Sequence, residues 1–379
     1  MKPLLHHPAT TDGQPAIPFV SLQYPEPQTH CLTLAAQRVI QSGIYLRGNE
    51  TKSFEQEWAA FTAQQYCVGV ANGLDALTLV LLAWKTIYHW DDGDQVIVSA
   101  HTFYASHLAI LRARLIPVPC DATADGYLLN PQLIPHLITP RTRAILPVHL
   151  YGFTADMPTI MQIANDHSLL VLCDAAQCHT QPQSPLTYGH AAAFSFYPTK
   201  NLAALGDAGA ITTNDPELAN TVRLLANYGG NYTGNYPLIG INSRLDELQA
   251  ALLRTKMAWL QQETARRRQI AQRYITQITN PHIMLPPIAS VNSSTWHIFP
   301  LLTPHRDALQ AHLAQKGIQT AIHYPIPPHQ QPTLRQIEPQ NLNQTLKIAQ
   351  EQLSIPIFAQ LKDTQVDYII NQINNFTPN

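Results

Sequence analysis

The 379-residue chain is poor in cysteine and in charged side chains. It has five cysteines, and none of them has the Cys-x-x-Cys spacing of a zinc or redox site. A small, odd number of cysteines argues against a disulfide-stapled scaffold and is typical of a reducing compartment. The 17 histidines include no His-Glu-x-x-His motif. We therefore expect no metal site.

The chain also lacks the features of nucleic-acid-binding, secreted and membrane proteins. Its formal net charge is -2, and its lysines and arginines are scattered apart from the run Arg266–Arg268, so no surface for polyanions is indicated. No apolar run approaches the roughly 18 residues of a membrane-spanning helix. Residues 1–18 contain His and Pro where a secretory signal has its apolar core. We expect a soluble cytoplasmic protein that binds neither nucleic acid nor membrane.

What the sequence does have is a long α/β pattern. Apolar residues make up 45% of the chain, and its length favours two domains. Between Phe54 and Ala251, short apolar runs alternate with helical patterns, which predicts helices around a mainly parallel sheet. The run Leu169–Cys173 is apolar without alternation, as in a strand covered on both faces. The predicted strands are Tyr66–Ala71, Gln95–Val98, Ala144–Val148, Leu169–Cys173, Ala191–Phe196 and Ala210–Thr213.

The pattern changes in the last third of the chain. A long helical stretch, Leu245–Ile278, is followed by the proline-rich segment Asn280–Ser294. We predict a large domain over residues 1–255 and a smaller α+β domain over residues 256–379. In the smaller domain the pattern predicts strands at Trp296–Leu302 and Gln319–Tyr324 and helices at Asp307–Lys316 and Val366–Asn374.

Three segments, in chain order, carry the residues that pyridoxal phosphate (PLP) chemistry needs. They are Asp174–Gln177, Phe194–Lys200 and Gly206–Gly209. PLP enzymes need a lysine for the imine with the cofactor and a carboxylate that keeps the pyridine nitrogen protonated. Asp174 follows a predicted parallel strand, and ligands of open α/β sheets bind at that edge. Lys200 and Asp174 are therefore the candidate catalytic pair.

Further candidates lie near strand ends. Gly73 permits a tight strand-to-helix turn whose N–H groups can hold a phosphate, with Asp75 as the expected helix cap. An ordinary βα turn explains this segment equally well. Ser195 offers a hydroxyl near Lys200, or a buried structural one, and Phe103 offers a ring that stacks on the cofactor or packs in the core.

Taken together, these and other ordered segments resemble the DegT family of sugar-nucleotide aminotransferases, a branch of the fold type I PLP enzymes. The resemblance covers nearly the whole chain. It is closest to the subgroup that aminates C3 of dTDP-3-keto-6-deoxyhexoses. The segments that carry it include Ile17–Leu22, Gly69–Leu77, Leu146–Gly152, Asp174–Gln177, Phe194–Leu202, Asn242–Ala251 and Ile322–His329.

The resemblance implies a role for each site residue. Lys200 is the Schiff-base lysine, Asp174 the partner of the pyridinium nitrogen, and Gln177 the partner of the ring hydroxyl. The remaining assignments are a stacking ring (Phe103), a phosphate loop (Gly73, Leu74, Asp75 and Ser195), a phosphate contact from the neighbouring subunit (Asn242), and residues towards the sugar nucleotide (Tyr197, His323, Tyr324 and His329). The contact from Asn242 implies a homodimer with shared active sites.

The resemblance also implies the reaction: transfer of an amino group from L-glutamate to a dTDP-linked keto sugar. Amination at C4, and a PLP-binding regulatory protein without turnover, are the alternatives. A related sugar dehydratase has His in place of the lysine, so Lys200 argues against it. The loop Gly229–Tyr236 lacks the lysines that relatives carry there and that, by the resemblance, meet the diphosphate of the sugar nucleotide. Arg244 is a candidate for the carboxylate of glutamate, although an ion pair with Asp246 or Glu247 explains it more simply.

Overall fold

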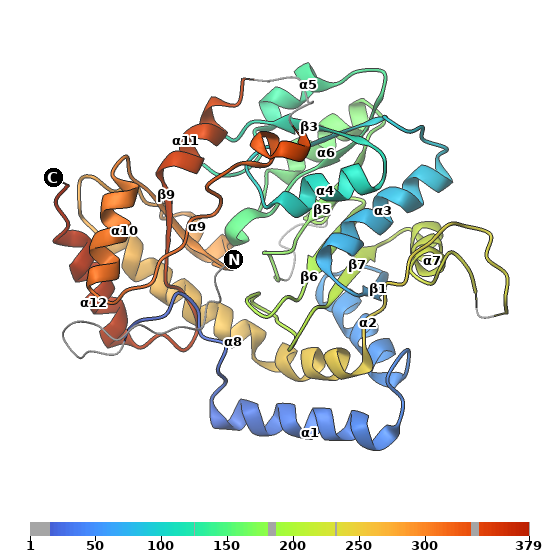
Figure 1. Cartoon of the computed structure of the whole chain (residues 1–379), viewed down its shortest axis with the longest axis horizontal. Coiled ribbons are helices and arrows are strands. Elements are labelled where there is room, and N and C mark those ends of the chain that lie inside the picture. The colour runs from blue at the N-terminus through green and yellow to red at the C-terminus, as the bar shows by residue number, and fades with distance from the viewer. Residues whose placement is uncertain (1–15, 125, 181–186, 232, 335–340, 379) are drawn as a thin grey trace.

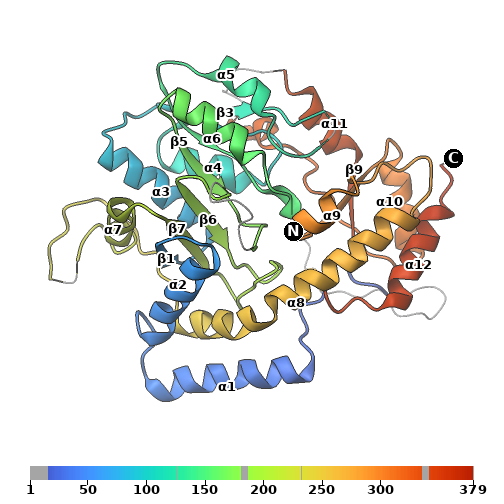
Figure 2. The same ribbon diagram turned by 180° about the vertical axis from the view of Figure 1, so that it is seen from behind.

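A seven-stranded mixed sheet forms the centre of the larger part of the molecule (Figures 1 and 2). The computed structural model describes residues 16–378 except 125, 181–186, 232 and 335–340, so most of the N-terminal stretch and Tyr232 lie outside the described residues. The strand order is β1-β7-β6-β5-β4-β2-β3. The strands are β1 (Tyr66–Val70), β2 (Gln95–Ser99), β3 (Ile116–Cys120), β4 (Thr142–Leu146), β5 (Leu170–Asp174), β6 (Ala191–Ser195) and β7 (Gly209–Thr213).

Only β7 runs antiparallel to its neighbours, β1 and β6; the other described pairs are parallel. The prediction of a mainly parallel, mixed sheet is confirmed. Parallel strands end at one edge of a sheet, so residues that follow β5 and β6 meet there.

Helices cover both faces of the sheet because its strands are apolar on both sides. One face packs against α3 (Gly73–Ile87), α4 (Tyr104–Arg112) and α7 (Pro216–Leu225). The other packs against α2 (Asn49–Phe61), α5 (Ile134–Leu137), α6 (Met157–Asp166) and α8 (Glu247–Gln277). In β5, Leu172 packs on the first face, and Val171 and Cys173 pack on the second. This arrangement explains why the run lacks alternating polar residues.

A second core forms around the strand pair β8 (Phe299–Leu302) and β9 (Gln352–Ile355), which run antiparallel. It includes residues of α8 from Ile270 onwards, together with α10 (Arg306–Gln315), α12 (Asp363–Asn374) and the short α9 (Ser290–Ser293). The helix α11 (Asn343–Glu351) precedes β9. The helix α8 continues without a break through residue 255, where the sequence analysis places the domain boundary. That boundary remains a prediction.

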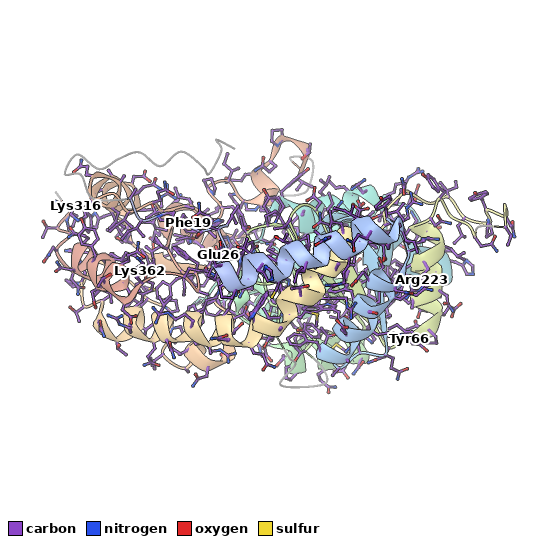
Figure 3. The ribbon with its side chains drawn as sticks, turned by 90° about the horizontal axis from the view of Figure 1, so that it is seen from below. Phe19, Glu26, Tyr66, Arg223, Lys316 and Lys362 are labelled. Atoms are coloured by element: carbon purple, nitrogen blue, oxygen red, sulfur yellow. The ribbon has the colours of Figure 1, made fainter. Side chains whose placement is uncertain are left out.

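The N-terminal helix α1 (Glu26–Ser42) lies along α8 (Figure 3). Its buried residues Leu32, Ala35 and Val39 pack against Ala251 and Leu252. Among the described residues, no helix is both long enough and apolar enough to cross a membrane. The five cysteines are all free thiols.

Two sequence predictions differ from the structure. The strand β3 was not predicted, because Pro117 and Pro119 interrupt its pattern; it lies at the edge of the sheet, where missing N–H groups are tolerated. The predicted strand Gln319–Tyr324 is wrong, since only one isolated bridge forms there, between Ala321 and Ser354. Beyond it the N–H of His323 bonds to a side chain, the Oε1 atom of Gln352, so the ladder does not continue.

Candidate active site

Asp174 is the last residue of β5 and is 6% exposed. Oδ2 accepts a hydrogen bond from the Ser106 hydroxyl at 2.7 Å, and Oδ1 accepts one from the Ala176 N–H at 3.1 Å. Burial raises the pKa of Asp174, while these two hydrogen bonds and the charge of Lys200 oppose that rise. A nearby cation would stabilise the ionised form further. Ser106, on α4, was not predicted from sequence.

Lys200 stands in the loop that follows β6 and is half-buried. Burial lowers the pKa of Lys200 to about 8, and the charge of Asp174 opposes this shift. The lysine is thus much closer to neutrality at physiological pH than a surface lysine. Its main chain is fixed, since its N–H donates to the Tyr197 carbonyl at 2.8 Å. The structure therefore brings the predicted catalytic pair into electrostatic contact across the strand ends.

The loop after Lys200 is tied to the rest of the protein at nearly every residue. The Asn201 amide donates to the Thr295 carbonyl at 2.7 Å, and the Leu202 N–H donates to Nδ1 of buried His179 at 3.0 Å. These contacts come from distant parts of the chain and hold the lysine in one place.

Lys256, on α8, also holds the loop after Lys200 in place, and this role was not predicted from sequence. Its ammonium donates to the Ala203 carbonyl and to the Tyr24 hydroxyl. Burial lowers the pKa of Lys256 to about 8, and burial raises the pKa of Tyr24 to about 12. A buried amine with only neutral hydrogen-bond acceptors is costly. The hydrogen bond from Lys256 to the Ala203 carbonyl joins the loop after Lys200 to α8.

The turn between β1 and α3 lies against the end of β6. A Cβ atom added to Gly73 would lie 2.7 Å from the Cβ of Ser195, so only glycine allows this approach. The expectation that Asp75 caps α3 is wrong: the cap is Asn72, whose side chain accepts from the Asp75 N–H at 2.8 Å. Asp75 instead pairs with Arg112 at 3.1 Å. The first N–H groups of the helix, those of Gly73 and Leu74, stand at its open end beside Ser195.

The Gln177 side chain is held between two tyrosines, Tyr151 and Tyr324. Its Oε1 accepts the Tyr151 N–H at 2.6 Å, which leaves its Nε2 as a donor, and Nε2 bonds to the Tyr324 hydroxyl at 3.1 Å. The Tyr324 ring contacts the ring of Phe103, with centroids 5.4 Å apart. Phe103, directly before α4, is 49% exposed, so one side of its ring is available to a ligand.

His323 belongs to the same group. Its carbonyl accepts a hydrogen bond from the Tyr151 hydroxyl, which also bonds to Nε2 of buried His101 at 2.9 Å. The imidazole bonds to the Ser354 hydroxyl at 2.8 Å. Burial lowers the pKa of His323 to about 4, and the charge of Lys200 lowers it further. This histidine is neutral at physiological pH and is a hydrogen-bonding group rather than a charge.

Three further expected site residues are at least partly exposed. Asn242 is exposed and bridges to Asn227. Tyr197, after β6, is 46% exposed. His329, in a 3-10 turn (Pro328–Gln330), has Asp121 as its electrostatic neighbour.

The ion pair of Arg244 with Asp246 or Glu247, expected from the sequence, does not form among the described residues. Its guanidinium lies 5.9 Å from the centroid of the Tyr228 ring. The carboxylate of Glu247 instead accepts hydrogen bonds from the backbone N–H groups of Gly48, Glu50 and Thr51. Within the described part of the chain, neither Asp246 nor Glu247 pairs with Arg244.

Comparison with solved structures gives the same architecture. The chain matches the structure described as Streptomyces venezuelae DesV in complex with a ketimine intermediate, with a TM-score of 0.90 and 40% sequence identity. The match covers 95% of this chain and 98% of that one. At this similarity the two chains share the same fold.

Two curated relatives are similar over nearly their whole lengths. The erythromycin biosynthesis sensory transduction protein EryC1 of Saccharopolyspora erythraea is 43% identical over 362 residues, 93% of this chain and 98% of the relative. The dTDP-3-amino-3,6-dideoxy-alpha-D-galactopyranose transaminase of Aneurinibacillus thermoaerophilus is 42% identical over 345 residues, 90% and 94% respectively. The model of one family matches residues 29–374. The chain belongs to the DegT/DnrJ/EryC1/StrS aminotransferase family.

Proposed function

We propose that this protein transfers an amino group from L-glutamate to C3 of a dTDP-linked 3-keto-6-deoxyhexose, giving the 3-amino-3,6-dideoxy sugar nucleotide and 2-oxoglutarate. Membership of the family shows that the chain is a sugar-nucleotide aminotransferase that depends on PLP. The choice of a dTDP-linked sugar and of C3 is supported by the relative from Aneurinibacillus thermoaerophilus, whose name gives a dTDP-3-amino-3,6-dideoxy sugar.

The residues present fit PLP. Gly73 lets the open N-terminus of α3 approach Ser195 more closely than a residue with a Cβ could, and N–H groups at such a helix end favour a phosphate. Asp174 is a buried carboxylate and Lys200 an amine whose pKa is lowered to about 8. These are the two groups that the cofactor needs. The chemistry that PLP supplies when bound is an electron sink for the carbon that loses its proton.

Lys200 and Asp174 divide the work. Lys200 holds the cofactor covalently and, once displaced by a substrate amine, accepts and returns the substrate proton, which requires its neutral form. The lowered pKa of Lys200 provides that form near neutral pH. Asp174, ionised, keeps the proton on the pyridine nitrogen, and the Ser106 hydroxyl orients its carboxylate.

The aromatic group positions the cofactor and the substrate. Gln177, whose Oε1 accepts the Tyr151 N–H, would bind the ring hydroxyl of the cofactor through Nε2, and the exposed ring of Phe103 would stack on the cofactor ring. Tyr324 bonds to Gln177, and His323 bonds to Gln352 and Ser354 of β9; the sugar enters beside these two residues in this proposal. Tyr197 and His329 are the other residues that, by the family resemblance, lie towards the sugar nucleotide.

A homodimer is part of the proposal. Asn242 is exposed in one chain and, by the family resemblance, reaches the phosphate of the neighbouring subunit. Exposed apolar side chains gather in the segments that flank it and in the segments before α2, and such groups in a soluble protein mark an interface. They are Ile40, Ile44, Tyr45, Leu46, Tyr228 and Ile239.

The observation that carries the proposal is that Asp174, the last residue of β5, and Lys200, in the loop after the adjacent parallel strand β6, lie at the same edge of the sheet. The test uses dTDP- and UDP-linked 3-keto and 4-keto sugars with L-glutamate, and identifies the product by mass. We expect turnover of the dTDP-3-keto sugar; amination of only 4-keto sugars would contradict C3 regiochemistry. A regulatory protein without turnover would release no 2-oxoglutarate.

Variants test the two residues directly. Lys200→Ala should abolish turnover, whereas Lys347→Ala, which removes an exposed lysine of α11, should not change it. Asp174→Asn keeps the size of the side chain but removes its charge, and should weaken both cofactor retention and rate. Activity like that of the wild type in Asp174→Asn would remove the electron-sink argument.

A further inference from the structure

The strand β9, in the second core (Figure 1), carries two fully buried polar side chains that contact His323. Gln352 and Ser354 are both 0% exposed, and each of them bonds to His323, which is partly exposed. The backbone of Ser354 is fixed as well, because its N–H donates to the Ala321 carbonyl at 2.7 Å and its carbonyl accepts the Ala321 N–H at 3.1 Å. Polar groups buried this deeply are costly unless they are hydrogen-bonded.

The main chain of His323 sets the orientation of the Gln352 amide. The His323 N–H is a donor, and Oε1 of Gln352 accepts it at 2.7 Å. The reversed amide would place two donors against each other. With Oε1 engaged in this way, Nε2 faces Ser354 and donates to its hydroxyl oxygen at 2.6 Å. The Ser354 oxygen therefore already accepts one hydrogen bond.

The hydroxyl proton of Ser354 has one acceptor left. Within the described part of the chain, the Ser354 Oγ bonds only to Nε2 of Gln352 and, at 2.8 Å, to Nδ1 of His323. Because Ser354 is fully buried, a hydroxyl that accepted both bonds would keep a proton without a partner. Burial lowers the pKa of His323 to about 4, so the ring carries a single proton at physiological pH. If Nδ1 accepts from Ser354, that proton stands on Nε2.

The imidazole ring is also held by its aromatic neighbours. The ring of Phe19 packs against it, with centroids 5.7 Å apart and planes 31° apart, and the ring of Tyr324 meets it edge-on with centroids 5.4 Å apart. Phe19 is fixed in turn, since its N–H donates to Oε1 of Gln319 at 3.2 Å. None of the described residues hydrogen-bonds to Nε2 of His323, so this atom is left for a ligand.

We infer that Gln352 and Ser354 are positioning residues, which hold His323 as an Nε2–H donor for an oxygen of the keto sugar. The inference rests on the proposed function, in which the sugar enters beside His323 and Tyr324. A neutral N–H donor suits the uncharged carbonyl and hydroxyl oxygens of a sugar, whereas an imidazolium would suit a phosphate. The buried pair on β9 thus selects both the protonation state and the direction of the donor.

The protonated nitrogen can be observed in the PLP-loaded protein by nuclear magnetic resonance after labelling of the histidine nitrogens. The His323→Gln variant identifies the signals of His323 by their loss. We expect a neutral ring protonated on Nε2 in the wild type, and loss of this single form in Ser354→Ala. A wild-type ring protonated on Nδ1, or an unchanged spectrum in Ser354→Ala, would overturn the inference. The measurement needs no turnover, so failure of the proposed function would not affect its result.

Kinetics test whether the two buried residues act through His323. Ser354→Ala and Gln352→Met should each raise KM for the sugar nucleotide about tenfold, as expected for one lost hydrogen bond, and leave the half-reaction with L-glutamate unchanged. In a His323→Phe background, Ser354→Ala should have no further effect on KM, because its partner is gone. A tenfold rise in both backgrounds would show that Ser354 acts elsewhere, against the inference.

Two matched comparisons separate this role from a general loss of structure. His323→Gln keeps an amide donor near the position of Nε2, whereas His323→Asn places its amide near Nδ1, so only His323→Asn should raise KM about tenfold. Thr303→Val removes another buried hydroxyl, directly after β8, which accepts the His305 N–H at 3.1 Å. This control should lower the temperature of unfolding without changing KM. Equal KM values in the two His323 variants, or a tenfold rise in Thr303→Val, would contradict the assigned role.

Discussion

Ser106→Ala tests how the carboxylate of the site is kept ionised. The Ser106 hydroxyl donates to Oδ2 of Asp174 at 2.7 Å, and both residues are buried. A hydrogen bond to a buried charged group contributes about 1.5–3 kcal/mol. If Asp174 must be ionised for turnover, loss of that bond should lower kcat/KM roughly ten- to a hundredfold.

The pH dependence gives the sign of the effect. Burial already raises the pKa of Asp174, and the Ser106 hydrogen bond opposes that rise. Without the bond the pKa rises further, so the carboxylate is protonated over a wider acid range. The acid limb of the kcat/KM profile should therefore move to higher pH in Ser106→Ala, and the loss of activity should shrink as pH increases.

Thr345→Val is the control for this variant. The Thr345 hydroxyl donates to Oδ1 of Asp121 at 2.6 Å, and Thr345 is also fully buried, so the same kind of bond is removed from a different carboxylate. Its acid limb should match that of the wild type. A Ser106→Ala variant that loses activity equally at every pH would show that Ser106 acts by packing, and would refute the reasoning.

The strands that were predicted correctly owe their signal to burial on both faces. In β5 every residue between Val171 and Asp174 is buried, so the run is apolar until the functional carboxylate appears. Asp174 and Lys200 both follow strands, and their chemistry could be inferred from residue type and position. The strand β3 was not predicted because Pro117 and Pro119 are typical of loops rather than strands. Its place at the edge of the sheet allows both prolines, since their missing N–H groups are tolerated there.

The supporting residues could not be inferred in this way. Ser106 is 68 residues from Asp174, and Lys256 is 53 residues from Ala203. A serine or a lysine within a helical pattern is usually solvated, and only tertiary packing shows that each of these is buried against the site. The surroundings of His329 could not be inferred from sequence either. It stands close to His323 in the sequence, but the charged group that acts on it is Asp121, about 200 residues earlier in the chain.

Three further predictions concern the cofactor site. Because burial lowers the pKa of Lys200 to about 8, the apoprotein should form its imine with added PLP at a rate that rises with pH and has its midpoint near pH 8; a midpoint near 10.5 would contradict this. Gly73→Ala brings a Cβ within 2.7 Å of the Ser195 side chain, so we expect the free energy of unfolding to fall by about 1–3 kcal/mol and the Kd for PLP to rise. Thermal unfolding measures the first effect and titration with PLP the second. Lys256→Met removes the buried donor of the Ala203 carbonyl, which costs about 1–3 kcal/mol. If Lys256 positions the Lys200 loop, the pH dependence of the visible absorbance of the lysine-bound cofactor should shift, because the environment of that lysine changes; a loss of stability with an unchanged absorbance profile would reduce Lys256 to a structural support.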